Sequence, residues 1–311
     1  MNYTMVQNNT KDRYEEAFVK NFIIVLLGIT INCINGVFVF IFFRSSIFYN
    51  DPRYILYIHL VINDMLMVCI TVSLYVMSYA WRSVPVPFCI ILLMTGATTH
   101  KNTPLTLAGM AIERYIAICK PLHHSQICTV HRTYILISMI WGAGVIPGLA
   151  DLIITLIVRP LSLFTKGTLC SSTYLYNTPY NEDKSKVINV FYTAVVWVII
   201  VFTYYRVLVT ARKATSDKSS AKKAQNTILL HGGQLMLCML SYITPLIDMT
   251  FAPLLPAQWT KITFLNYLLG NIVPRLLTPL IYGVRDKHFY KHIKRIFACR
   301  FFNVKVELTQ K

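Results

Sequence analysis

Glu113, Arg114 and Tyr115 stand at the end of an apolar run, residues 89–112, that is long enough to cross a bilayer. Charge is expensive at such a place and is seldom present without a role. Arg114 cannot lose its charge, so it needs an acidic or polar partner at rest, and the adjacent Glu113 can supply one. We interpret the triplet as a switch at the membrane edge; the alternative is a solvated triplet that only anchors the helix end.

Other ionisable side chains inside apolar runs include Asp64, Lys101 with its neighbour His100, and Arg275. A charge at the centre of a membrane helix carries an insertion penalty of about 2.5 to 3.5 kcal/mol by translocon scales. These side chains are therefore expected to face other helices or a polar cavity instead of lipid.

Composition predicts the elements that must hold these residues. Of the 311 residues 55% are hydrophobic and 14% are charged, which is unusual for a soluble domain. Runs of about 20 apolar residues match the hydrocarbon core of a bilayer, and they are too long and continuous for barrel strands. The sequence predicts an all-α membrane protein, a seven-transmembrane helix bundle. The seven runs are residues 22–43, 54–79, 89–112, 134–158, 187–210, 228–254 and 262–284.

Lys and Arg residues predict the orientation of the bundle. With the N-terminus outside, 19 of them fall on the cytoplasmic side and nine on the outer side. We therefore expect an extracellular segment at 1–21, a receptor domain at 22–284 and a cytoplasmic tail at 285–311. The net charge of +17 is attributed to anionic membrane lipid and not to nucleic acid. Residues 211–213 and 221–223 are expected to continue the fifth and sixth helices beyond the lipid.

Cysteines and sequons agree with this orientation. Of the eight cysteines, only Cys89 and Cys170 fall on the outer, oxidising side, so they are expected to form a disulfide. Asn2 and Asn8 begin glycosylation sequons on the segment assigned outside.

Together these motifs resemble the rhodopsin-like, class A G-protein-coupled receptors, and specifically the odorant receptors. The resemblance covers Asn35 to about Arg285. Three departures indicate a fish-type receptor: Cys238 to Leu240 replace a usual Phe-Tyr-Gly, Thr278 replaces a usual Asn, and Cys170 is alone in its loop. The matching residues are Asn35 and Gly36, Leu60 to Asp64, Cys89, residues 110–123, Trp141, residues 202–204, Lys223 with His231, and residues 279–282.

The resemblance implies that a small odorant binds from outside and that a heterotrimeric G protein of the olfactory stimulatory type, which raises cAMP, binds inside. The Gα C-terminal helix would enter a cleft between helices three, five and six, and Tyr204 and Tyr282 would swing inward beneath it. Lys223, Pro121 and Leu122 are assigned to the coupling surface, although Pro121 also fits a simple helix stop.

In the receptor fold Asp64 and Arg275 lie at similar depth, and with Asn35 they would form an intramembrane polar network. We hypothesise that they form an ion pair where related receptors hold sodium. The alternative is that Asp64 binds sodium or water while Arg275 reaches backbone carbonyls.

Receptors of this family keep their ligand pocket near the middle of helix three, where Lys101 and His100 lie one turn below Gly96 and Ala97. The cation suggests a small anionic or polar odorant; the alternative is a structural pair with a neighbouring acidic or polar residue. The further pocket candidates, each of which also fits core packing, are Asn189, Tyr192, Tyr242, Ile243 and Asn271.

Residues 286–297 alternate basic and apolar side chains and predict an interfacial amphipathic helix, beside which Cys299 is either a palmitoylation site or a free thiol. A transporter would show repeat-related halves, and an intramembrane enzyme would show a catalytic or metal array such as H-E-x-x-H; neither pattern is found. The chain is therefore not expected to be an enzyme or to need a cofactor. A class A receptor for a non-olfactory ligand and a dimeric assembly stay open.

Overall fold

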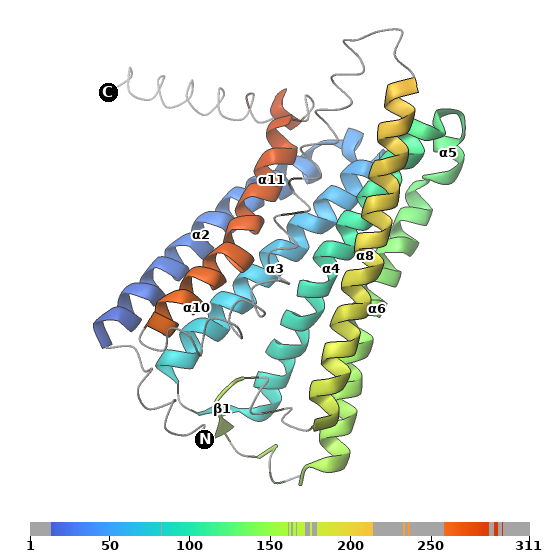
Figure 1. Ribbon diagram of the computed structural model, residues 1–311. Helices are drawn as coiled ribbons and strands as arrows, with labels where there is room; N and C mark the ends of the chain where they lie inside the picture. Colours follow the sequence, from blue (N-terminus) through green and yellow to red (C-terminus); the bar gives the residue numbers. More distant parts are fainter. Residues whose placement is uncertain are drawn as a thin grey trace, which may run out of the picture.

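The computed structural model is a bundle of long helices that run side by side (Figure 1). It describes residues 14–81, 83–160, 162, 164–165, 167–171, 175, 179–213, 233, 236, 258–285, 289–291 and 294. The long helices are α2 (Tyr14–Arg44), α3 (Pro52–Ala80), α4 (Val86–Cys119), α6 (Val130–Val158), α8 (Pro179–Lys213), and a last one made of α10 (Trp259–Tyr267), η5 (Leu268–Ile272) and α11 (Val273–Arg285). The predicted run at 228–254 lies outside the described residues.

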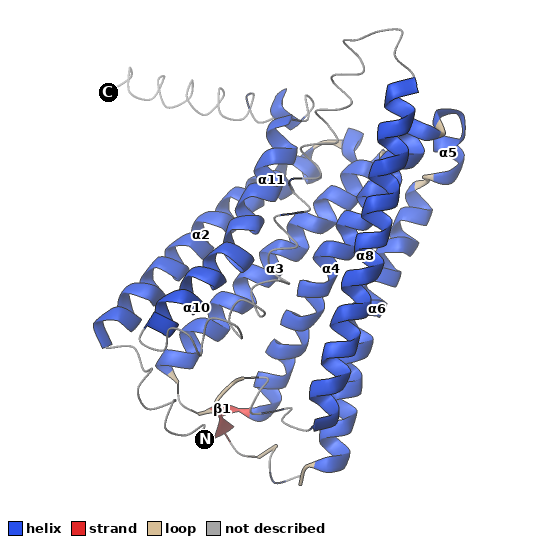
Figure 2. Ribbon diagram, in the orientation of Figure 1, coloured by secondary structure: helices blue, strands red, loops and turns tan. Residues whose placement is uncertain are grey.

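Short elements mark the two ends of the bundle. At one end β1 (Val84–Pro85) pairs antiparallel with β2 (Gly167–Thr168), and Figure 2 shows how little strand there is beside the helices. The other end carries η1 (Ser46–Asn50), η2 (Pro121–His123) and α5 (His124–Ile127), and Figure 1 places α5 opposite β1. The helix bundle therefore has a strand-bearing end and a loop-helix end.

Five described segments are long and apolar enough to cross a membrane: Glu15–Arg44, Pro52–Ala80, Val130–Val158, Val187–Thr210 and Thr260–Ile281. The central helix α4 is more polar, because it packs against α3, α6 and α8 and buries polar side chains among them. Its buried polar residues include Thr98, Thr99, Asn102, Thr103 and Thr106. The predicted helical bundle is confirmed.

Helix bounds extend the predicted apolar runs by a few residues. The N-terminal helix α2 begins at Tyr14, ahead of the first apolar residue predicted to enter the bilayer. Helix α8, which corresponds to the predicted fifth helix, continues to Lys213, as expected. Polar or charged residues can extend a helix past the lipid because the helix satisfies its own backbone hydrogen bonds there.

Two residues define the start of α3, the cap residue Asp51 and the first helical residue Pro52. The Asp51 carboxylate accepts a hydrogen bond from the backbone N–H of Arg53 at 3.0 Å, which caps the helix, and Pro52 occupies the first turn. Asp51 also forms an ion pair with the Arg53 side chain.

An aromatic cluster packs the loop-helix end of the bundle. The Phe289 ring, which follows α11 in the chain, stacks on Phe48 of η1 at a centroid distance of 4.4 Å and meets Tyr57 of α3 edge-on at 5.4 Å. Phe289, Phe48 and Tyr57 are fully buried. The first apolar residue of the predicted amphipathic segment, residues 286–297, is therefore buried in protein.

Candidate functional site

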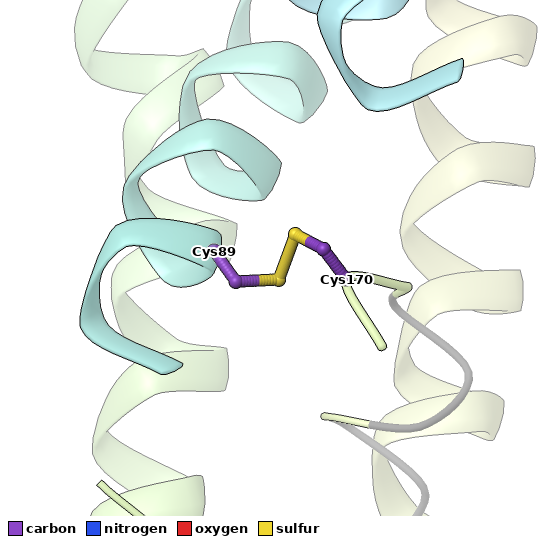
Figure 3. Close-up of a disulfide and its surroundings, with 2 residues drawn as sticks. All are labelled: Cys89 and Cys170. Carbon is purple, nitrogen blue, oxygen red and sulfur yellow. A yellow bond between two sulfur atoms is a disulfide. The ribbon is translucent and has the colours of Figure 1, made fainter. Parts of the chain in front are cut away.

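The predicted disulfide joins Cys89 of α4 to Cys170, two residues after β2 (Figure 3). The two Cα atoms are 5.4 Å apart, and the bond closes a separation of 81 residues. Met77 and Val84 pack against it. A bridge closing a loop of this length stabilises the fold by about 4 kcal/mol. It ties the segment after β2 to the helix that carries the central polar residues.

Arg275 and Asp64 meet in the middle of the bundle. Arg275 Nε lies 3.3 Å from Asp64 Oδ1, and both side chains are at most 1% exposed. Arg275 also donates from Nη2 to Met67 Sδ at 3.2 Å. This is the ion pair hypothesised from the receptor resemblance, and it places a fixed cation on one side of the carboxylate.

Threonine and asparagine side chains complete the surroundings of Asp64. Thr103 of α4 donates to Asp64 Oδ1 at 2.9 Å, and Asn63 donates to Thr103 Oγ1 at 3.0 Å and to the Thr99 carbonyl at 2.9 Å. A buried charge is tolerable when such groups satisfy its hydrogen bonds. Within the described residues, Asp64 Oδ2 and the side-chain atoms of Asn35 make no hydrogen bond.

The last transmembrane helix changes its winding just before Arg275. Residues Leu268–Ile272 form a π-helical turn, which α11 follows at Val273. Such a turn inserts an extra residue and rotates everything after it, and it often occurs at functional sites. Here it sets the face on which Arg275 emerges.

Lys101 of α4 points toward α8. Its Nζ lies 6.0 Å from the centroid of the Tyr192 ring, within cation–π range. Tyr192 in turn donates its hydroxyl to the Ala143 carbonyl of α6, so its ring is held in place. Nearby Asp151 of α6 attracts Lys101 electrostatically, but it is ion-paired with Lys184 of α8.

Four other predicted pocket residues, Gly96, Ala97, Asn189 and Asn271, differ in their surroundings. Gly96 faces α3, since a Cβ there would lie 3.3 Å from Ile70 Cγ2, which gives this glycine a packing role. Ala97 and Asn189 are exposed, and Asn271 lies half-buried in the π-helical turn. The structure thus brings together Lys101 and Tyr192 and adds Asp151 and Lys184, which sequence reasoning missed.

His59 connects three helices. Trp141 of α6 donates from Nε1 to His59 Nε2 at 2.9 Å, so the ring hydrogen of neutral His59 must sit on Nδ1. Nδ1 lies 3.2 Å from Thr106 Oγ1 of α4. This histidine is a structural link between α3, α4 and α6.

Glu113, the acidic partner of Arg114, also contacts His124. Arg114 Nε lies 3.9 Å from Glu113 Oε2, which is too long for a hydrogen bond. The closer partner of Glu113 is His124, the first residue of α5, whose Nε2 lies 2.9 Å from Glu113 Oε1. Glu113 itself is buried. The sequence analysis predicted that Glu113 and Arg114 belong to the switch, but it predicted no role for His124.

Contacts between α4 and α8 flank this ion pair. The Tyr115 and Phe202 ring centroids are 5.9 Å apart, and Cys119 Sγ lies 3.2 Å from Thr210 Oγ1. Tyr204 of α8 is half-buried against the main core. Pro121 starts η2, and Leu122 beside it is 87% exposed.

Several predicted site residues lie outside what the structure describes. They are Asn2, Asn8, Lys223, Tyr242, Ile243 and the side chain of Tyr282.

Comparison with known proteins places this arrangement in a family. Residues 34–282 match the family model described as 7 transmembrane receptor (rhodopsin family). The chain is 30% identical over 291 residues to odorant receptor 131-2 of Danio rerio, covering 92% of this chain and 89% of that protein. It is 28% identical over 229 residues to olfactory receptor 2W1 of Homo sapiens, covering 70% and 68%.

A bundle of membrane-spanning helices with a disulfide at one end and an acid–arginine pair at the other defines a class of membrane receptor. The chain belongs to the rhodopsin family of seven-transmembrane receptors, among its odorant receptors of the fish type. It is a non-enzymatic, multi-pass membrane protein.

Proposed function

We propose that this receptor binds a small odorant from the outer side and activates a heterotrimeric G protein of the olfactory stimulatory type, which raises cAMP. The observation that carries the proposal is the Glu113–Arg114 pair, which lies near the C-terminal end of α4, whereas the disulfide residue Cys89 lies near the N-terminal end of the same helix. Disulfides form on the oxidising side of a membrane, so Arg114 would face the cytosol.

The same argument supports the orientation proposed from the charge bias, with residues 1–21 outside, 22–284 in the plasma membrane and 285–311 in the cytosol. Asn2 and Asn8 would then be glycosylated. Anionic lipid would contact the basic cytoplasmic ends. The odorant receptors among the relatives support odour sensing as the role.

The Lys101 site supports a ligand that carries a negative charge. Among the described side chains, two cations, Lys101 and Lys184, interact with one acid, Asp151, which gives these three residues one positive charge in excess. A carboxylate or other small anion that entered between α4 and α8 would neutralise it, while the Tyr192 ring would contact the apolar part of the ligand. His100, Gly96, Ala97, Asn189 and Asn271 complete the proposed pocket residues, together with Tyr242 and Ile243.

On the cytoplasmic side, Arg114 would be released from Glu113 when the bundle opens, and Tyr115, Tyr204, Lys223 and Tyr282 would border the cleft for the Gα helix. Leu122, with Pro121, offers an exposed apolar contact for the G protein.

The test is a cAMP assay in cells that express the receptor with the olfactory-type Gα, screened with amino acids, bile salts, nucleotides and short organic acids. An anionic compound should raise cAMP in wild-type cells, and Lys101→Met should reduce its potency at least tenfold. Leu208→Met, at a half-exposed position toward the other end of α8, is the control. Responses only to cations or neutral compounds would contradict the ligand proposal.

A further inference from the structure

A proline inside α6 leaves one backbone carbonyl of this helix without its usual partner. Pro147 has no N–H, so it cannot donate to the carbonyl of Ala143, four residues earlier in the helix. The hydroxyl of Tyr192 on α8 donates to that carbonyl instead. Because the hydrocarbon of a membrane offers no other donor, this contact fixes the Tyr192 ring against α6.

A lysine of α8 makes a second contact with the same face of α6. Lys184 donates to the Pro147 carbonyl at 3.3 Å and forms an ion pair with Asp151. Ala143, Pro147 and Asp151 follow one another at intervals of four residues, so they lie on one face of α6. The two helices are therefore joined by polar contacts over successive turns, and these contacts include a complete ion pair.

Lys101 of α4 lies at this junction of α6 and α8. Its Nζ is 6.0 Å from the centroid of the Tyr192 ring, and its charge is attracted by Asp151 and repelled by Lys184. We call Lys101, Asp151 and Lys184 the charge cluster; its net charge is one positive unit. The Lys184 and Asp151 side chains are 14% and 25% exposed, and Lys101 is also partly exposed, so a small molecule can reach all three.

The net charge of the cluster determines which anions it can accept. A ligand with one carboxylate would neutralise the excess positive charge, and its apolar part would contact the fixed Tyr192 ring. A ligand with two carboxylates would also bring a second negative charge close to Asp151, and salt screens charges in a partly buried site only weakly. We propose that Asp151 is a specificity-determining residue of the ligand site: it restricts the site to compounds with a single negative charge and excludes dicarboxylates of the same length.

The proposal rests on the anion site of the proposed function, and three variants test it by changing the charge of the cluster in known steps. Asp151→Asn leaves two cations, Lys184→Gln leaves one cation and one acid, and the double variant leaves Lys101 as one cation. Asp183→Asn is the matched control, because it removes an exposed carboxylate one residue before Lys184. The probes are hexanoate and adipate, which have the same chain length and differ by one carboxylate.

In wild type and in Asp183→Asn, hexanoate should bind at about tenfold lower concentration than adipate, because a unit charge about 10 Å away changes the binding of an anion by at least this factor at an effective dielectric constant of about 20. Asp151→Asn should lose this preference. Lys184→Gln should bind hexanoate about tenfold more weakly, since its cluster has no excess charge. The double variant should regain the wild-type preference, because its cluster again has one positive unit.

The measurement is the rise in the unfolding temperature of purified receptor in detergent, titrated with each probe, which does not need G-protein coupling. An unchanged preference in Asp151→Asn, a double variant as weak as Lys184→Gln, or no stabilisation of wild type by hexanoate would overturn the proposal. If Asp151→Asn fails to fold because Lys184 is stranded, Lys184→Gln and the double variant still decide the matter, since neither strands this lysine.

The same probes are then applied to cells in the cAMP assay. If the binding pattern is as described while no probe raises cAMP above the level of mock-transfected cells, the proposed function fails and the role of Asp151 stands. If hexanoate raises cAMP in wild type but every variant ranks the two probes alike, only the role of Asp151 fails.

Discussion

Removing either member of the Asp64–Arg275 pair should strongly destabilise the receptor. At 3.3 Å and an effective dielectric constant of about 20, the two charges attract each other by about 5 kcal/mol. The cost of taking both ions out of water is of similar size, so the pair as a whole contributes little. Each single substitution, Asp64→Asn or Arg275→Gln, strands one buried charge and should cost about 3 to 5 kcal/mol.

The assay is a double-mutant cycle on purified receptor, read as thermal unfolding in detergent and as the surface-expressed fraction in cells. The double variant should recover most of the loss, because neither charge is then stranded. Asp64→Asn keeps a side-chain oxygen that can accept the hydrogen bond from Thr103, so the cycle measures the effect of removing the charge alone. Met67→Leu, which removes the sulfur that Arg275 contacts without stranding a charge, is the control and should cost about 1 kcal/mol. Additive losses in the double variant would refute the reasoning.

Three further predictions concern the two ends of the bundle. Arg114→Ala should reach the cell surface yet lose ligand-driven cAMP, and full signalling by this variant would exclude the proposed role of Arg114. Cys89→Ser should cost about 4 kcal/mol, measured as lost surface expression, and Cys170→Ser should add nothing further because the same bond is already missing; a further loss in the double variant would contradict this. Asp51→Ala removes the helix cap of α3 and should lower the free energy of unfolding by about 1 kcal/mol, whereas an unchanged unfolding temperature would show that Pro52 alone suffices to start the helix.

Apolar runs predicted the long helices because a bilayer demands both length and hydrophobicity, and neither depends on distant contacts. The disulfide was predictable for a similar reason: topology left two cysteines, Cys89 and Cys170, on the oxidising side. Charge inside a run predicted that Asp64 and Arg275 need partners, and the receptor resemblance supplied their common depth.

Contacts that depend on the rotation of helices or the course of loops could not be predicted in this way. Lys184 and Asp151 meet only because α6 and α8 pack in a particular register, and nothing in their sequence spacing of 33 residues signals it. His124 reaches back 11 residues to Glu113 because the chain turns twice after Lys120. The π-helical turn before Arg275 has no hydrophobic signature of its own.

The burial of Phe289 has a practical consequence for anyone who attaches a reporter to this receptor. Its ring packs in a block with rings from η1 and α3, so Phe289, four residues past Arg285, is part of the folded body. A fluorescent protein or luciferase fragment fused upstream of Phe289 would pull this ring out of the block. The same reporter joined downstream would leave this aromatic block intact and would report its movement.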